Sequence, residues 1–421
     1  MPESSPSSLP AGTQDRSGRA TVVFTACSAN YLAKALAMCR SVLDHNSGMD
    51  VVILVVDRKR DVALRDARVR IVWVEDIGFP GLLRCAFKYN IIELNTALKP
   101  WAAQYLLAEY RKVIYLDPDI CVFSSLASVD DELERWSVLL TPHALSPYDG
   151  PGRPDDQDLL RFGAFNLGFF AVNRSAPSRA MLSWWHRQCL SLCFYDPPSG
   201  LGVDQKWMDL APSFFDGVRI VKDPGLNVAF WNLHERRLAR DSDGWLVNGT
   251  HRLHFVHFSS FAEDDTTAVA QKQTRYEPGA RPDFSAVADV YRTYLREAAD
   301  GVALETAYGF STFDGGQTIS PLLRRMFALH ERELLADGDD PFASTGPVFR
   351  FARRHHLLST AKPATAHVNF KAAKDHAKSQ RFMATLFRIV LRVVGPDRYF
   401  LLMRFLGHYS STLNQLDLLG P

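Results

Sequence analysis

The stretch that most constrains the fold of this chain is the short apolar run 113–116, which is followed at once by Asp117, Pro118 and Asp119. The run reads Val-Ile-Tyr-Leu, a β-favouring pattern that is typical of a strand buried on both faces of a sheet. Pro118 disfavours helical geometry at Asp117, and side chains two positions apart in extended backbone project to the same side. We therefore expect both carboxylates to face one point at the end of a buried strand.

Two carboxylates that face one point repel each other unless a cation lies between them. Carboxylate oxygens are hard ligands that suit Mg²⁺ or Mn²⁺, and Mg²⁺ is usually held by one or two carboxylates together with substrate phosphates and water. Asp117 and Asp119 are therefore candidate ligands of such an ion. The alternative is an ordinary acidic turn after a core strand, because short acidic motifs also occur by chance.

The chain around this strand alternates between strand and helix patterns. Strand patterns cover 21–26, 51–56 and 69–74, and helical apolar spacing covers 30–45 and 93–109. Such alternation predicts an α/β fold with a mixed, mostly parallel sheet flanked by helices. Ligands of open α/β sheets bind beyond the carboxyl ends of the strands, so we expect the loops after Ala26, Asp57 and Leu116 to converge.

Several function classes lose support from the sequence. Neither Gly-x-Gly-x-x-Gly nor Gly-x-x-x-x-Gly-Lys-Ser/Thr occurs, which weighs against a dehydrogenase or a P-loop enzyme. The formal net charge of +1 gives no overall attraction to nucleic acid, and no nucleic-acid-binding motif is recognisable. We predict that the protein has no nucleic-acid partner.

Composition divides the chain into three predicted parts. Residues 1–20 are rich in Ser, Pro and Gly and lack the apolar stretch of a secretory signal, so we expect a disordered leader. The main α/β domain is predicted over 21–335, and a basic helical extension over 341–421. The six cysteines are dispersed, and no run of about 18 apolar residues occurs. The dispersed cysteines favour a reducing, cytoplasmic compartment, and the lack of such an apolar run argues against a membrane-spanning helix.

The extension contains one segment with a marked helical pattern. Residues 380–394 combine a wide apolar face with Arg381, Arg388 and Arg392 at spacings of seven and four, as in a basic amphipathic helix. Such a helix packs on the main domain or lies on an anionic membrane, where a lipid-linked acceptor would be found. The second alternative would place the protein peripherally at the inner face of the membrane.

A series of segments resembles, in order, the landmarks of GT-A-fold nucleotide-sugar glycosyltransferases. The segments are 23–31 (Val-Phe-Thr-Ala-Cys-Ser-Ala-Asn-Tyr), 115–119 (Tyr-Leu-Asp-Pro-Asp), 165–173 (Phe-Asn-Leu-Gly-Phe-Phe-Ala-Val-Asn), 203–205 (Val-Asp-Gln) and 254–260 (His-Phe-Val-His-Phe-Ser-Ser). The chain is most similar to the retaining family that contains glycogenin and bacterial lipopolysaccharide galactosyltransferases, glycosyltransferase family 8. Segments 223–235 and 308–317 also look like bacterial enzymes that assemble surface polysaccharides.

The resemblance implies a GT-A, Rossmann-like fold and transfer of a hexose from a nucleotide sugar, in particular a UDP-sugar, to a hydroxyl of a glycan or lipid-linked acceptor. It implies that Mn²⁺ or Mg²⁺ is held by Asp117, Asp119 and His257. It implies that the donor nucleotide is bound by Ala26, Asn30, Tyr31, Asp57, Lys99 and Asp117, with Tyr31 stacked on uracil. The residues that it places around the donor sugar are Asn166, Asp204 and Gln205.

Simpler explanations exist for several of these residues. Asn30 and Asp204 are also candidate caps of the helices that follow them. Lys99 would ordinarily be a solvated helix lysine, and Asn166 would fit a buried polar network. His254, on the opposite face of the strand that ends at His257, is expected to be a packed histidine.

The sequence departs from the family pattern after His257. Relatives continue with a glycine and then a lysine for the diphosphate, whereas this chain has Ser260, Phe261 and the acidic run 263–265. Lys272 is the nearest later candidate for that role. Gln205 is a poor nucleophile, so the resemblance favours a front-face mechanism in which the leaving-group oxygen helps to deprotonate the acceptor.

Two other function classes remain open. A sugar-1-phosphate nucleotidylyltransferase would share the sheet and the metal carboxylates, but 25–31 lacks the Gly-rich, basic nucleotide loop that such an enzyme needs. A non-catalytic binding module on the same fold needs no intact metal site, and the presence of Asp117, Asp119 and His257 favours catalysis.

Overall fold

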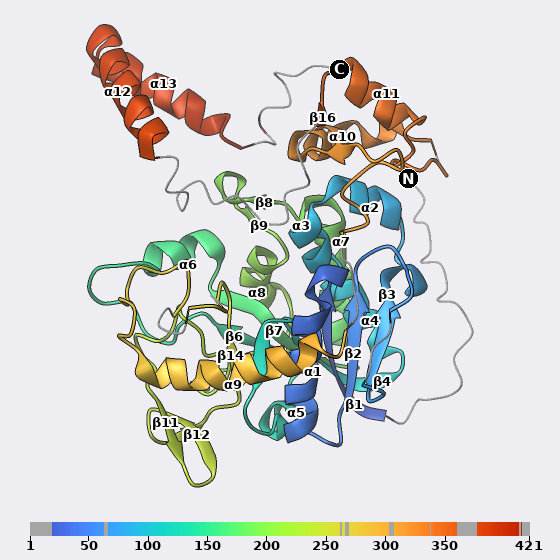
Figure 1. The fold of residues 1–421 in the computed structure, drawn as a ribbon, viewed down its shortest axis with the longest axis vertical. Coiled ribbons are helices and arrows are strands. Elements are labelled where there is room, and N and C mark those ends of the chain that lie inside the picture. The colour runs from blue at the N-terminus through green and yellow to red at the C-terminus, as the bar shows by residue number, and fades with distance from the viewer. Residues whose placement is uncertain are drawn as a thin grey trace. The chain divides into compact units, whose positions relative to one another are not determined.

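The computed structural model describes residues 19–62, 66–261, 263–265, 269–302, 307–336, 338–359, 377–411 and 414, without the side chains of 19 and 377–380. The chain is grouped into two compact units, of which the first comprises Met1–Leu82, Ile91–Tyr195 and Gly202–Gly309, and the second Leu83–Asn90, Asp196–Leu201 and Phe310–Pro421 (Figure 1). The predicted leader over 1–20 lies outside the described residues except at Arg19 and Ala20, which begin the first strand. The predicted boundary between the main domain (21–335) and the extension (341–421) falls inside the second unit.

Within its described residues, the first unit contains a seven-stranded sheet in the order β10-β6-β7-β4-β1-β2-β3. The strands are β1 (Arg19–Cys27), β2 (Asp50–Val55), β3 (Val69–Trp73), β4 (Tyr110–Leu116), β6 (Val138–Pro142), β7 (Phe165–Asn173) and β10 (Val218–Ile220). Neighbouring strands run parallel from β4 to β3 and between β10 and β6, whereas β7 is antiparallel to both β4 and β6. The predicted mixed, mostly parallel sheet is confirmed.

Helices cover both faces of this sheet, which is why the apolar run in β4 is buried on each side. Ile114 belongs to the cluster that packs beneath α1, α5 and α9. Tyr115 points the other way, and its ring lies 4.9 Å from that of Phe24 and 5.2 Å from that of Phe170. The helices that lie wholly in the first unit are α1 (Leu32–His45), α3 (Ile91–Ala97), α4 (Lys99–Leu107), α5 (Ala127–Arg135), α6 (Asp156–Phe162), α7 (Ala176–Leu192), α8 (Ala211–Phe214) and α9 (Pro282–Ala299).

The single helix predicted over 93–109 is wrong, because the structure has two helices there, α3 and α4, which are separated at Leu98. Pro100 explains the break. Proline lacks a backbone N–H and clashes with the preceding turn inside a helix, but it fits the first turn, where that N–H has no partner. The new helix therefore begins at Lys99, directly before the proline.

A smaller pair of strands positions the candidate site. Strand β5 (Ile120–Val122) pairs antiparallel with β14 (Phe255–His257), with His257 opposite Ile120. The N–H of Phe258 donates to the carbonyl of Asp119 at 2.8 Å, which extends this pairing. The N–H of Asp117 donates to the carbonyl of Gly168 in β7, also at 2.8 Å. Backbone pairing thus fixes the Asp-Pro-Asp turn on both sides. A separate hairpin sheet contains β11 (Leu238–Asp241), β12 (Gly244–Val247) and β13 (His251–Arg252).

The second unit is built around aromatic side chains and the buried Arg324. The ring of Phe87 packs against those of Phe313, Phe327 and Phe342. Arg324 donates to the carbonyls of residues 86, 87, 89 and 310, which joins separate stretches of this unit. Its elements include α10 (Pro321–Leu334), α11 (Pro347–Arg354), α12 (Ala377–Val394), α13 (Pro396–His408), β15 (Thr318–Ile319) and β16 (Leu358–Ser359).

The amphipathic helix predicted over 380–394 is confirmed as part of α12. Phe382, Ile389 and Val393 are 68%, 51% and 77% exposed, and Phe400 and Leu401 of α13 are also more than half exposed. In the described part of the chain, apolar side chains of both helices are therefore exposed, and the choice between packing on the main domain and lying on a membrane stays open. Among the described residues, no helix has both the length and the apolar character needed to cross a membrane.

Candidate metal centre

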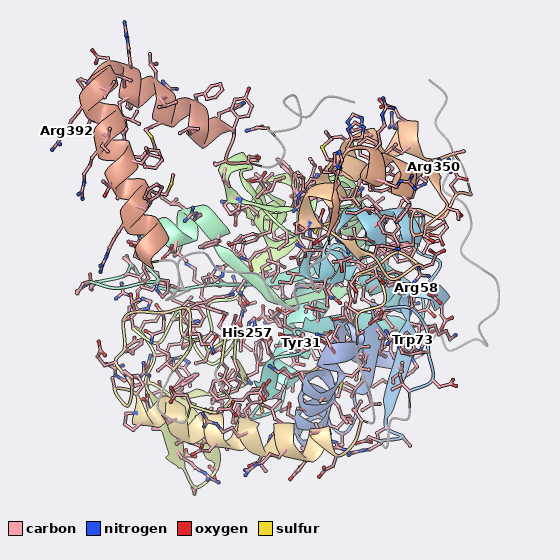
Figure 2. The ribbon with its side chains drawn as sticks, turned by 45° about the horizontal axis from the view of Figure 1, so that its top comes forward. Tyr31, Arg58, Trp73, His257, Arg350 and Arg392 are labelled. Atoms are coloured by element: carbon pink, nitrogen blue, oxygen red, sulfur yellow. The ribbon has the colours of Figure 1, made fainter. Side chains whose placement is uncertain are left out.

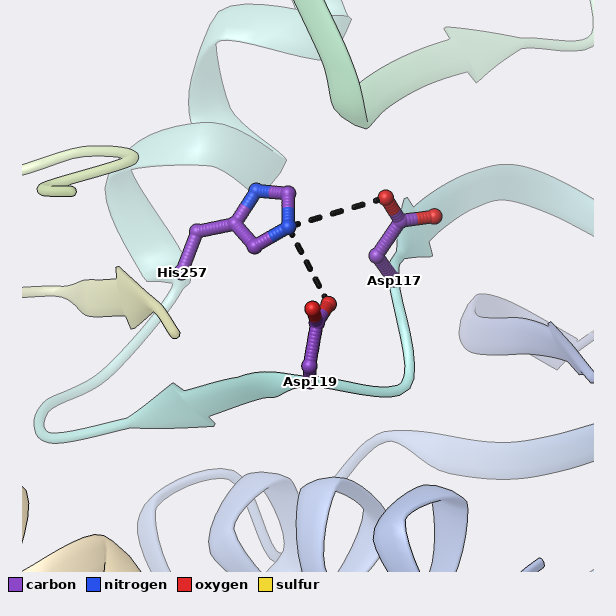
Figure 3. Close-up of side chains that lie close together, drawn as sticks. All are labelled: Asp117, Asp119 and His257. Carbon is purple, nitrogen blue, oxygen red and sulfur yellow. Dashed lines mark ion pairs between the residues drawn. The ribbon is translucent and has the colours of Figure 1, made fainter. Parts of the chain in front are cut away.

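Three side chains from distant parts of the sequence meet at the end of β4. Ligand atoms of Asp117, Asp119 and His257 all lie within 4.8 Å of one another. Nε2 of His257 is 3.0 Å from Oδ1 of Asp119 and 3.7 Å from Oδ2 of Asp117, and the imidazole points into the space between the two carboxylates (Figure 3). The prediction that both carboxylates face one point is confirmed, and the histidine faces that point too.

The imidazole of His257 is held in place by a hydrogen bond on the side that faces away from the carboxylates. Its Nδ1 lies 3.1 Å from Oδ1 of Asn166, an oxygen that also accepts from the N–H of Gly168 and from Nδ2 of Asn227, both at 3.1 Å. Because an amide oxygen only accepts, Nδ1 carries the hydrogen and donates it, and the lone pair of neutral His257 is then at Nε2, on the side of the carboxylates. The ring of Trp231 packs edge-on against the imidazole, with a centroid distance of 5.1 Å.

The electrostatics of the cluster reflect this proximity. Burial by itself lowers the pKa of His257, but the charges of Asp119 and Asp117 and the hydrogen bond to Asp119 outweigh burial, so the pKa of His257 is raised. Burial likewise raises the pKa of Asp119. The positive charge of His257, its hydrogen bond to Asp119 and the charge of Lys34 outweigh burial, so the pKa of Asp119 lies below its usual value. A positive charge is therefore favoured between the two carboxylates.

The donor set fits a divalent cation. Two carboxylates and one neutral imidazole nitrogen converge from three directions, and the imidazole is oriented by an amide oxygen on its far side, as metal-bound histidines usually are. A carboxylate-rich set of this kind suits Mg²⁺ or Mn²⁺. An ordinary acidic turn would not need His257, from a different strand, to point between its two carboxylates.

Lys99 joins this centre to a third carboxylate. The predicted alternative of a solvated lysine is wrong, since the residue is 3% exposed. Its Nζ is 3.2 Å from Oδ1 of Asp117 and 3.2 Å from Oδ2 of Asp204, donates to the carbonyl of Leu167 at 2.9 Å, and lies over the ring of Tyr115. Burial lowers the pKa of Lys99, but the two carboxylate charges outweigh it and leave the pKa raised.

Asp204 is the most deeply buried acid of the group, at 2% exposure. Burial raises its pKa to about 6, against the lowering effect of Lys99. The residue does occupy the N-cap position of a 3₁₀ helix, η4 (Gln205–Asp209), but its side chain makes no capping hydrogen bond. The predicted cap is therefore wrong in its chemistry, because the carboxylate is turned towards Lys99 instead.

The other two predicted sugar contacts, Asn166 and Gln205, lie next to each other. Oε1 of Gln205 accepts from the N–H of Leu167 at 3.1 Å and is 3.4 Å from Nδ2 of Asn166, and its Nε2 donates to the carbonyl of Phe162 at 2.9 Å. The predicted polar network around Asn166 is thus present, and it includes the candidate metal ligand His257. Contact of either amide with a sugar stays a prediction.

The candidate nucleotide residues follow the parallel strands β1 and β2. Asp57 is fully buried, and its carboxylate accepts from the N–H groups of Ala29, Arg58 and Gly309 and pairs with Arg60. This carboxylate therefore ties together the loops after β1 and β2, as expected of loops that converge.

Tyr31 and Asn30 lie in the short 3₁₀ helix η1 (Ala29–Tyr31), directly after β1, which contains Ala26. Tyr31, labelled in Figure 2, is exposed, with 43% of its surface open to solvent. The expected cap at Asn30 is not seen, because its Oδ1 accepts from Ser28, and Ser28 occupies the N-cap position without a side-chain cap bond. Binding of a nucleotide by these residues stays a prediction.

His254 and Lys272, the weaker candidates from the sequence, do not join the cluster. His254 is directed away from the cluster, with Nδ1 2.9 Å from the carbonyl of Ser125 and Nε2 3.6 Å from Asp223, in agreement with a packed histidine. Lys272 is exposed, and among the described residues it makes no ion pair or hydrogen bond.

Sequence reasoning missed four residues of the site. Asn227 supports Asn166, Gly168 leaves room for the imidazole of His257, and Tyr115 donates to Oδ1 of Asp117 at 2.5 Å. Lys34 is the fourth, through its charge on Asp119. The only available signal for Asn227 was a polar residue inside the apolar stretch 226–229, and nothing local distinguishes Lys34 from other helix lysines.

No family model matches the chain. The chain is 26% identical over 262 residues to the uncharacterized protein YfnD of Bacillus subtilis strain 168, covering 59% of this chain and 79% of that protein. It is 24% identical over 246 residues to the uncharacterized protein YfnF of the same strain, covering 56% of this chain and 80% of that protein.

Two solved structures of similar proteins belong to glycosyltransferases. One is the galactosyltransferase LgtC in complex with donor and acceptor sugar analogues, with 18% identity, coverage of 66% of this chain and 95% of that chain, and a TM-score of 0.40. The other is the glycosyltransferase GlyE of Streptococcus pneumoniae TIGR4, with 14% identity, coverage of 70% and 66%, and a TM-score of 0.39. At these identities and TM-scores the similarities assign no activity to this chain.

Proposed function

We propose that the chain is a metal-dependent glycosyltransferase of the GT-A type, which moves a hexose from a UDP-sugar to an acceptor hydroxyl with retention of configuration. The observation that carries the proposal is the convergence of Asp117, Asp119 and His257 on one point at the carboxyl end of β4. Tyr31 and Asp57 follow the parallel strands β1 and β2, whose carboxyl ends lie at the same edge of the sheet.

Asp117, Asp119 and His257 would hold Mn²⁺ or Mg²⁺, which as a Lewis acid stabilises negative charge on a leaving diphosphate. The remaining residues position this set. Asn166 orients the imidazole, and Lys99 fixes the carboxylate of Asp117 by an ion pair. Fixed polar groups of this kind need little rearrangement when charge develops in the transition state.

The transfer step exchanges one bond at the anomeric carbon for another. The bond from this carbon to the phosphate oxygen breaks, the bond to the acceptor oxygen forms, and the acceptor proton passes to the departing phosphate oxygen. The amide of Gln205 is a poor nucleophile, and it is held by hydrogen bonds from the N–H of Leu167 and to the carbonyl of Phe162. A front-face reaction on the retained side of the sugar agrees with this arrangement.

The acceptor class is a glycan or a lipid-linked glycan of a bacterial surface polysaccharide. Peripheral attachment of a cytoplasmic enzyme to an anionic membrane would bring it to a lipid-linked acceptor. The exposed apolar side chains of α12, together with Arg381, Arg388 and Arg392, support this attachment.

A donor panel with Mn²⁺ tests the proposal. Nucleotide sugars are supplied without acceptor, and the release of nucleoside diphosphate is measured, with UDP-sugars expected to turn over and excess chelator expected to stop turnover. Asp119→Asn should abolish release and weaken Mn²⁺ binding measured by calorimetry, while its circular dichroism stays unchanged. Asp243→Asn is the matched control, because this carboxylate is 74% exposed in the β11–β12 hairpin.

Each outcome of the panel has a definite meaning. Formation of a nucleotide sugar and pyrophosphate from UTP and a sugar 1-phosphate would identify a nucleotidylyltransferase instead. Binding of UDP without turnover of any donor would identify a binding module. Full turnover by Asp119→Asn, or in excess chelator, would refute the metal assignment.

A further inference from the structure

Lys34 lies in the first turn of α1 and makes two contacts that bear on the candidate site. Its Nζ is 2.8 Å from Oε1 of Glu263, and it is 5.2 Å from the centre of the Tyr31 ring. The lysine side chain is 29% exposed and the glutamate side chain 47% exposed, so both can be reached by a ligand from solvent. The lysine is therefore next to the residue expected to stack on the base.

The face of α1 that carries Lys34 is directed towards β5. Lys34 and Ser41 are seven positions apart and share a face of the helix. Oγ of Ser41 accepts from the N–H of Val122 in β5 at 3.0 Å, and β5 begins directly after Asp119. The charge of Lys34 also acts on the carboxylate of Asp119 and lowers its pKa.

Glu263 is held in place by a turn that is tied to α9. Nε of Arg292 donates to the carbonyl of Glu263 at 3.2 Å, and its Nη2 donates to the carbonyl of Asp265 at 2.9 Å. The guanidinium group also lies over the ring of Phe261. The acidic run 263–265 therefore presents a carboxylate to Lys34 at the place in the sequence where a lysine would have been expected to serve the diphosphate.

We propose that Lys34 neutralises the diphosphate of the donor, and that the Glu263 carboxylate holds its ammonium group until a phosphate oxygen takes its place. The inference rests on the proposed function. A nucleotide whose base stacks on Tyr31 and whose diphosphate reaches a metal at Asp119 would bring its phosphates close to Lys34, because Lys34 contacts the Tyr31 ring and its charge acts on Asp119. An ammonium group offers three donors to phosphate oxygens, and an exposed carboxylate is a replaceable partner for it.

Calorimetry of UDP and of uridine in the presence of Mn²⁺ tests the proposal, because only UDP carries the phosphates. Lys34→Met should raise the Kd for UDP by roughly 10- to 100-fold, the range expected for a hydrogen bond to a charged group. It should leave the Kd for uridine within about twofold. Lys34→Arg should restore much of the affinity for UDP, since it keeps the charge.

Glu263→Gln and Lys272→Met complete the experiment. Glu263→Gln removes the competing charge and should lower the Kd for UDP several-fold, whereas a merely structural ion pair predicts no such gain. Lys272→Met, the exposed lysine nearest after the acidic run, should leave both affinities unchanged.

The proposal is overturned if Lys34→Met binds UDP as the unaltered protein does, or if Lys272→Met loses the affinity instead. Failure of the unaltered protein to bind UDP at all would overturn the proposed function as well, so the two failures are distinguishable.

Discussion

Gly168→Ala should displace the imidazole of His257 without touching any ligand atom directly. A Cβ at this position would lie 2.4 Å from Cε1 and 2.5 Å from Nδ1 of His257, and 2.9 Å from Oδ1 of Asn166. Nonbonded carbon atoms pack at about 3.5 to 4.0 Å, so the ring must move by about 1 Å or more. The backbone at 168 has little freedom to yield, because its carbonyl accepts from the N–H of Asp117.

The size of the effect follows from these contacts. Inserting a methyl group into a packed site costs about 1 to 3 kcal/mol of folding free energy. Loss of the hydrogen bond between His257 and Asn166 costs about 1 kcal/mol more. Disturbing the partner that orients a metal-bound histidine typically weakens metal binding by about 10- to 100-fold. We therefore expect a moderate loss of stability and a larger loss of function.

Calorimetric titration with Mn²⁺ in the presence of UDP, together with urea denaturation, checks both expectations. Gly48→Ala is the control, because a Cβ at that exposed position meets no atom within 4 Å. In a His257→Ala background the ring is absent, so Gly168→Ala should cost much less stability than it does in the unaltered protein. Additive effects of the two substitutions, or normal Mn²⁺ affinity of Gly168→Ala, would refute the steric argument.

Three further predictions concern the nucleotide, the core and the surface. Tyr31→Ala should weaken UDP by about 1 to 3 kcal/mol if its exposed ring stacks on the base, and tighter binding of GDP than of UDP by the unaltered protein would contradict a uracil site. Burial lowers the pKa of His186 to about 4, below its unfolded value near 6.5, so its stabilising contribution is complete above about pH 6.5 and is lost as the pH falls towards 4. His186→Phe should therefore reduce the loss of unfolding free energy between pH 7 and pH 5, measured in urea, by on the order of 1 to 2 kcal/mol, and an unchanged loss would refute this. Replacing Arg381, Arg388 and Arg392 with Glu should abolish flotation of the full-length protein with anionic vesicles at low salt, and absence of flotation by the unaltered protein would count against membrane attachment.

Local patterns were sufficient to predict the sheet and the acidic turn. The apolar run before Asp117 predicts a strand and Pro118 predicts a turn, and both signals come from neighbouring residues. Asp57 likewise directly follows an apolar run that predicts its strand. The break at Leu98 was missed although Pro100 signals it, because the apolar spacing continues through the proline. Periodicity records which residues face a core, and it does not record where one helix ends and the next begins.

The partners within the site could not be predicted in this way. Burial of Lys99 between Asp117 and Asp204 depends on how α4 and η4 meet the sheet. The hydrogen bond from His257 to Asn166 depends on the register of β5 with β14 and of β4 with β7. These registers join residues that are far apart in the sequence, and no local pattern encodes them.

Lys34 is a residue of the site that no local sequence pattern identifies. A comparison of motifs looks for a lysine shortly after His257, but this chain has an acidic run there that includes Glu263. Electrostatic neutralisation of a phosphate depends on where a charge lies in space, and a helix packed beside β5 can supply it from a different part of the chain. The acidic run then has a physical use, because its carboxylate holds the lysine at 2.8 Å until an anion competes for it. The motif lacks its lysine because the phosphate-binding lysine lies in α1, and the acidic run stands in its place because Glu263 is the ion-pair partner of that lysine.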